Sequence, residues 1–193
     1  MNKRLLSKLE QGEGTTLMGK LFLTPRQRQT VLKWFLFSLV YLALQVLQDV
    51  VFSRVQVLGG CPDLVPGYLL LVCLTQGPGS GGLFALLAGG FRCLSGAVLG
   101  PVSLLVVTCS GVLLSAFRGG YLQRRFWPVM LCAWAGVLLH QGLMFSLGLF
   151  LGSTAAGRWM EALGGGLGTC LACCALYPLV LALGKIGGET WKE

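Results

Sequence analysis

Long apolar blocks with very few charges dominate this sequence and restrict the folds open to it. Only 11% of the 193 residues are charged, about half the share typical of a soluble domain. About 20 helical residues cross the ~30 Å hydrocarbon core of a bilayer. We therefore predict an all-α, polytopic integral membrane protein, a bundle of six transmembrane helices. The six predicted spans are residues 31–52, 62–76, 82–100, 101–118, 127–151 and 163–184.

The second block is the weakest of the six. Pro62 to Gln76 is 15 residues long, about 22 Å as a helix, and the glycine-rich stretch 77–82 that follows is a strong helix breaker. A re-entrant second segment would leave five spans. The basic residues favour six, because six spans put 12 of them on the side of the two termini and two, Arg54 and Arg158, on the other. Cytoplasmic loops carry the excess of Lys and Arg, so both termini are predicted to be cytoplasmic.

The chain divides into a basic N-terminal tail (1–30), the helical bundle (31–184) and a short C-terminal tail (185–193). Seven of the 15 Lys and Arg residues lie within the first 33 positions. A basic segment just before a hydrophobic span favours anionic lipid headgroups, so the net charge of +8 indicates a membrane surface and no nucleic acid. The N-terminal tail forms either short helices on the inner leaflet or a partly disordered segment.

Small residues and one charge share a face of the third predicted span. Ala85, Gly89, Arg92, Gly96 and Gly100 are spaced by four, three, four and four residues, which places them on one helix face. Small side chains allow a second helix to approach closely. A buried arginine costs several kcal/mol unless it is paired or hydrated, so Arg92 is predicted to face the bundle interior.

Few acidic side chains are available to pair with Arg92. Asp49 lies near the outer end of the first span, with Gln45 four residues before it on the same face, and Asp63 begins the second span. Asp49 is the predicted partner because its depth roughly matches that of Arg92. The alternative is an arginine that snorkels to the outer surface.

Two further polar or small-residue features lie in the last two spans. His140, in the middle of the fifth span, is expected to make one interhelical hydrogen bond. Gly164, Gly168 and Ala172 form a small-residue stripe that packs within the bundle or against a partner. Enzymes that act within a membrane usually place several polar residues at one depth, and the sequence pattern does not do so. We therefore expect no catalytic residue, cofactor or metal site.

The stretch from Pro62 to about Ser115 resembles the bacterial rod shape-determining protein MreD family. Pro62-Asp63-Leu64 is similar to that family's Pro-Asp-Leu element, and the segment from Gly82 to Gly100 is similar to its glycine-spaced third helix ending in Leu-Gly. There is one departure. The family commonly carries an Asp eight residues before the last glycine, and Arg92 occupies that place here.

The resemblance implies a non-enzymatic, multi-pass scaffold in the bacterial cell (plasma) membrane. Such proteins bind MreC-like single-span proteins and, through them, help couple MreB-like cytoplasmic filaments to cell-wall synthases that make peptidoglycan outside. The alternative is a substrate-binding membrane subunit of an energy-coupling factor type vitamin transporter. That class should show an aromatic-lined polar pocket and small residues on the first span, whereas the first span here is bulky from Trp34 to Phe52.

Overall fold

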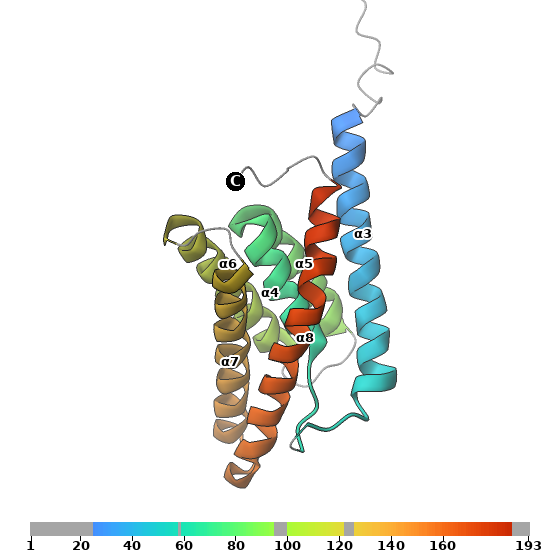
Figure 1. The fold of residues 1–193 in the computed structure, drawn as a ribbon. Coiled ribbons are helices and arrows are strands. Elements are labelled where there is room, and N and C mark those ends of the chain that lie inside the picture. Colours follow the sequence, from blue (N-terminus) through green and yellow to red (C-terminus); the bar gives the residue numbers. More distant parts are fainter. Residues whose placement is uncertain (1–24, 58, 95–99, 122–125, 187–193) are drawn as a thin grey trace, which may run out of the picture.

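The computed structural model describes residues 25–57, 59–94, 100–121 and 126–186, and within these ranges the chain is almost entirely helical. The helices run alternately up and down, and the first described helix begins at the same end of the molecule where the last one finishes (Figure 1). The elements are α3 (Pro25–Leu47) with its π-helical extension η1 (Gln48–Phe52), α4 (Leu64–Gln76), α5 (Pro78–Leu94), α6 (Gly100–Tyr121), α7 (Phe126–Phe150), the short 3-10 turn η2 (Ala156–Arg158) and α8 (Trp159–Lys185).

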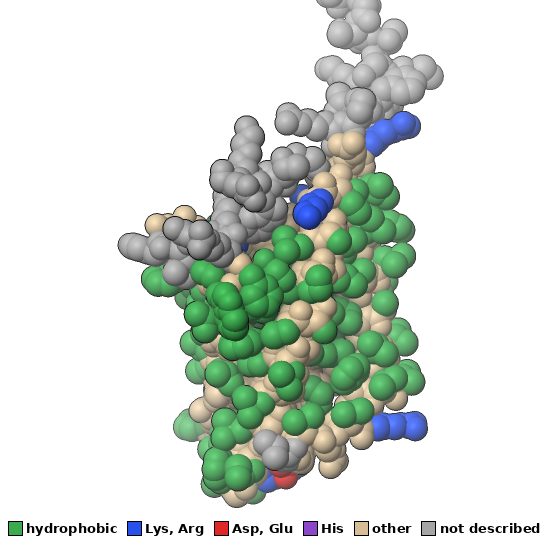
Figure 2. Space-filling view, viewed as in Figure 1, with side chains coloured by type: hydrophobic (Ala, Val, Ile, Leu, Met, Phe, Trp, Pro, Cys, Tyr) green, Lys and Arg blue, Asp and Glu red, His purple; other side chains and the backbone are tan. Residues whose placement is uncertain are grey.

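Four of these helical segments are long and apolar enough to cross a membrane. They are Gln27–Phe52, Gly100–Gly120, Phe126–Phe150 and Ala156–Lys185. Hydrophobic side chains cover the flank of the molecule, whereas the Lys and Arg side chains visible on this face gather at its two ends (Figure 2). A surface of this kind suits the hydrocarbon core of a bilayer, so the predicted helical membrane protein is confirmed at this level.

Helix α4 is the core of the bundle. It has 13 residues, about 20 Å of helix, and every residue from Leu64 to Thr75 is buried. It packs against α3, α5, α6, α7 and α8. A helix enclosed by protein need not match the thickness of the bilayer, because its ends meet protein groups and not lipid. The short second block is thus explained by its central position.

The boundaries of the third predicted span were wrong. Helix α5 begins at Pro78, so Gly77 alone separates it from α4, and the predicted breaker at 77–82 is mostly helical. Gly77 has φ 93°, a conformation that glycine adopts readily, and it lets the chain reverse in one residue. Helix α5 ends at Leu94, and Gly100 begins α6 instead of ending the third span.

The small-residue stripe of α8 packs inside the chain. Gly164 and Gly168 are buried and Ala172 is partly buried, and a Cβ at Gly168 would lie 2.9 Å from Cβ of Pro62. The extended segment before α4 therefore lies directly against the α8 backbone, as small residues permit. Of the predicted N-terminal tail, residues 25–30 belong to α3, and residues 1–24 and 187–193 lie outside the described part of the chain.

Candidate functional site

Helices α4 and α5 form a tight antiparallel hairpin whose open end carries one charge on each arm. Asp63 precedes Gly77 by 14 residues, and Arg92 follows it by 15. Two helices that run in opposite directions from one turn rise equally per residue, so these two side chains reach the same level. Asp63 is the N-cap of α4, and Arg92 lies in the last turn of α5. Each charge therefore also lies at the helix end whose dipole favours it.

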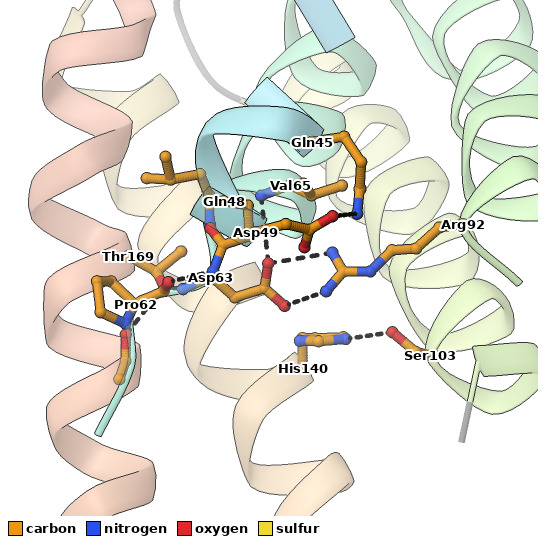
Figure 3. A network of polar contacts seen from close by, with 12 residues as sticks. Gln45, Gln48, Asp49, Pro62, Asp63, Val65, Arg92, Ser103, His140 and Thr169 are labelled. Carbon is orange, nitrogen blue, oxygen red and sulfur yellow. Dashed lines mark hydrogen bonds and ion pairs between the residues drawn. The ribbon is translucent and has the colours of Figure 1, made fainter. Parts of the chain in front are cut away.

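The two side chains form a bidentate ion pair. Arg92 Nη1 donates to Asp63 Oδ1 at 3.0 Å, and Arg92 Nη2 donates to Asp63 Oδ2 at 2.7 Å (Figure 3). The side chains are 22% and 25% exposed. Paired N–H groups that meet both carboxylate oxygens give the strongest arginine–carboxylate geometry. The cost of an arginine inside the bundle is thus offset by a partner from the neighbouring helix.

Polar side chains from α8 and η1 hold the backbone around Asp63. The Asp63 N–H donates to Thr169 Oγ1 at 2.9 Å. The amide of Gln48 accepts from the Leu64 N–H at 3.0 Å and donates to the Pro62 carbonyl at 2.8 Å. Asp63 Oδ1 also accepts from the Val65 N–H at 3.4 Å. Non-helical backbone at membrane depth is tolerated only where such groups are satisfied, so these contacts allow α4 to begin inside the bundle.

The ion pair lines a cavity of about 150 Å³ between α4, α5, α6 and α7. His140 and Ser103 lie on the same cavity, with His140 Nε2 and Ser103 Oγ 3.1 Å apart. This is the interhelical hydrogen bond expected of His140. Gln141 adds a further polar group, and the rest of the lining is aliphatic or small. A polar space of this size holds a few water molecules, which would hydrate the exposed edges of the ion pair.

The predicted pairing of Arg92 with Asp49 was wrong. Asp49 is an exposed residue of the π-helical turn η1, and its carboxylate accepts from Gln45 Nε2 at 3.3 Å. Asp49 lies near the guanidinium (Figure 3), but the ion pair is made with Asp63. The prediction compared the depth of Asp49 in the first span with the depth of Arg92 in the third. The register of the α4–α5 hairpin instead places Asp63 directly opposite Arg92.

The small-residue face of the third span serves the interior of the chain. Ala85 and Gly89 are buried and line the cavity with Gly100. A Cβ on Gly89 would clash with Leu104 of α6, and one on Gly82 would lie 2.7 Å from Val112 Cγ2. Close helix approach is what such residues permit. Gly96 lies outside the described residues.

Three residues of the site had no part in the prediction from sequence. Gln48 and Thr169 cap the buried start of α4, and Ser103 is the partner of His140. Gln48 is next to Asp49, but the sequence offers no way to tell which of two adjacent polar residues turns inward. Thr169 directly follows the glycine-rich segment of α8. Its position beside a close-packed stretch was the one signal in the sequence that could have identified it as part of the site.

Comparison with known proteins identifies no relative of this chain. No family model, no curated protein and no solved structure matches this chain. The site must therefore be interpreted from its own geometry.

Replacing Arg92 by leucine should destabilise the protein strongly. The Asp63 carboxylate would be left partly buried without its partner, and breaking a buried pair costs about 3–5 kcal/mol. We expect a loss near the lower end of that range, about 3 kcal/mol, because both side chains keep some exposure. Reversible unfolding of the purified protein in mixed detergent micelles would measure it.

Arg158→Leu is the matched control. Arg158 is paired with Glu161 at 2.6 Å, but its side chain is 61% exposed, and exposed pairs contribute little. Equal tolerance of the two substitutions would contradict a structural role for the Arg92 ion pair.

Proposed function

We propose that this chain is a non-enzymatic scaffold subunit of a bacterial cell-elongation complex, of the kind formed by MreD-like proteins. The proposal rests on one observation, which is that the two sequence elements that resemble the MreD family contact each other. The Pro62-Asp63-Leu64 element caps α4, the glycine-spaced segment forms α5, and the ion pair from Asp63 to Arg92 joins them. Arg92, the residue that departs from the family pattern, is therefore paired with Asp63 of the other element.

The size and lining of the cavity favour this proposal over a vitamin-binding subunit. Pockets for drug-sized ligands usually measure about 300–1,000 Å³ and are rich in aromatic side chains. The cavity beside Arg92 is about 150 Å³, and its described lining contains no Phe, Tyr or Trp. The first helix is bulky along its length and lacks the small-residue faces expected for docking an energy-coupling subunit. The proposed partners are an MreC-like single-span protein and, through it, MreB-like filaments and cell-wall synthases.

The proposal includes six membrane crossings with both termini in the cytoplasm. Its support is the placement of charge: Arg28, Lys33, Arg118 and Lys185 belong to the end where α3 begins and α8 finishes, and Arg54 and Arg158 lie toward the opposite end. The positive-inside rule assigns the first end to the cytoplasm. In this arrangement α4 and α5 are two short spans sheltered by the four longer ones.

Thiol labelling of intact cells tests this topology. Cys61 is exposed on the proposed outer side and should react with a membrane-impermeant maleimide. Gly79→Cys in a Cys61→Ser background should react only after the cells are permeabilised. Gly79 is an exposed position with open space around it, so the new thiol is well tolerated. Labelling of position 79 from outside would show that α4 and α5 form a re-entrant hairpin.

Depletion and co-purification test the function. Cells that lose this chain should lose their rod shape and become round, and the tagged full-length chain should co-purify from mild detergent with a single-span protein that has a large external domain. Re-expression of the Arg158→Leu variant should restore the rod shape. Unchanged cell shape, or co-purification with a bound vitamin or an ATPase module, would overturn the proposal.

A further inference from the structure

The cavity beside the ion pair has a polar end and an apolar end. Its lining includes three aliphatic side chains that are almost fully buried: Leu69, Ala85 and Val107. Along their helices these positions lie about 6–10 Å further into the bundle than Asp63, Arg92 and Ser103. The polar end lies nearer the surface, where the side chains of Arg92 and Asp63 keep 22% and 25% exposure. Aliphatic walls with a few converging polar groups are typical of a small-molecule site.

Arg92 keeps hydrogen-bond donors that the described part of the chain does not use. A guanidinium carries several N–H groups in a planar fork. Asp63 accepts from one N–H on each Nη atom. The Nε–H and the second N–H of each Nη atom have no acceptor among the described residues. An arginine inside the bundle is costly unless it is paired or hydrated, so these N–H groups need an oxygen atom from water or from a ligand.

Two further polar side chains of the lining, both on α7, have unused hydrogen-bonding groups. Gln141 makes no hydrogen bond to any described residue, although its amide can both donate and accept. His140 is 5% exposed. Ser103 is its partner at Nε2 (Figure 3), which leaves Nδ1 without a partner in the described part of the chain. Buried polar groups in native proteins nearly always have a partner, so these groups indicate a polar molecule in the cavity.

The size and shape of the cavity favour a molecule larger than water. Its volume of about 150 Å³ is close to that of an engineered protein cavity that binds benzene, so it has room for about six non-hydrogen atoms. Water can satisfy the polar end. The aliphatic end offers a water molecule no hydrogen-bond partner, and apolar cavities stay dry. A molecule with a polar group and a short aliphatic part would fill both ends.

Charge in the lining favours an uncharged ligand. The carboxylate of Asp63 already balances Arg92, and the described lining contains no other Lys, Arg, Asp or Glu. An anion that reached Arg92 would therefore also lie close to the Asp63 carboxylate, and burying an unbalanced charge is costly. The unused groups include the N–H donors of Arg92 and both functions of the Gln141 amide. They suit a group that accepts and donates hydrogen bonds without carrying charge, as a primary amide does.

We propose that this cavity is a binding site for a short, uncharged aliphatic molecule that ends in an amide. The ligand's carbonyl oxygen accepts from Arg92 and Gln141, and its N–H group donates to Asp63. Its alkyl chain lies against Leu69 and Val107. Such a ligand contacts α4, α5, α6 and α7 together, so its binding stabilises the folded bundle. The site goes beyond the proposed scaffold function and does not depend on it.

Titration of the purified full-length protein in lipid nanodiscs with butyramide tests the site. Saturation-transfer NMR of the ligand should show saturable binding with a Kd on the order of 1 mM, as expected of so small a molecule. Butyramide should also raise the midpoint of thermal unfolding. Butyrate is the matched control ligand, because it has nearly the same size and shape but carries a negative charge. It should bind at least about tenfold more weakly.

Gln141→Leu separates ligand binding from folding. The described fold makes no hydrogen bond with this amide, so the ligand-free variant should unfold at nearly the same temperature as the unmodified protein. Its affinity for butyramide should fall at least about tenfold, because a hydrogen bond to the ligand is lost. Gln56→Leu is the matched control, since it makes the same change at an exposed residue outside the cavity, and it should leave the affinity unchanged.

Three results would overturn the proposed site. They are the absence of saturable butyramide binding up to about 20 mM, equal binding of butyrate, and undiminished binding to the folded Gln141→Leu variant. The first would mean that the cavity holds water alone. Each of them would leave the scaffold proposal standing, because cell shape and co-purification test that proposal separately.

Discussion

The bidentate pair between Asp63 and Arg92 is the interaction on which the arrangement of the bundle depends. It joins the two free ends of the α4–α5 hairpin, and Gly77 closes the other end. Asp63 also caps α4, so one carboxylate satisfies a helix terminus and a guanidinium at the same time. In a membrane either charge alone is costly, so the fold that brings them together is favoured over one that separates them.

The pair also explains how a 13-residue helix can form the centre of a membrane bundle. Because α4 begins within the bundle, its first backbone groups need protein partners, and Gln48 and Thr169 supply them from two other helices. Glycines of α8 bring the backbone close enough for these contacts. The polar groups and the small residues therefore serve one purpose, which is to enclose a short helix that lipid could not cover.

Block hydropathy was sufficient to predict the helical membrane class, and the fifth and sixth spans matched α7 and α8 closely. Arg92 was correctly expected to face inward, since an unpaired arginine is costly. Its partner was missed because the glycine-rich stretch at 77–82 was interpreted as a loop, which shifted the hairpin register. A single-residue reversal at Gly77 depends on tertiary packing of α4 against α5, and helix propensity alone argues against helix in a Gly-Pro-Gly stretch. The inward turn of Gln48 likewise depends on contacts remote in sequence.

A double-mutant cycle on Asp63 and Arg92 tests the central claim most directly. Asp63→Asn keeps a side chain able to cap α4 but removes the charge, and Arg92→Gln removes the guanidinium while keeping a polar end. The unfolding free energies of both single variants and the double variant should reveal a coupling of at least about 1 kcal/mol, as expected for residues in one ion-pair network. Additive effects within about 0.5 kcal/mol would mean that the two charges do not stabilise each other and would contradict the claim.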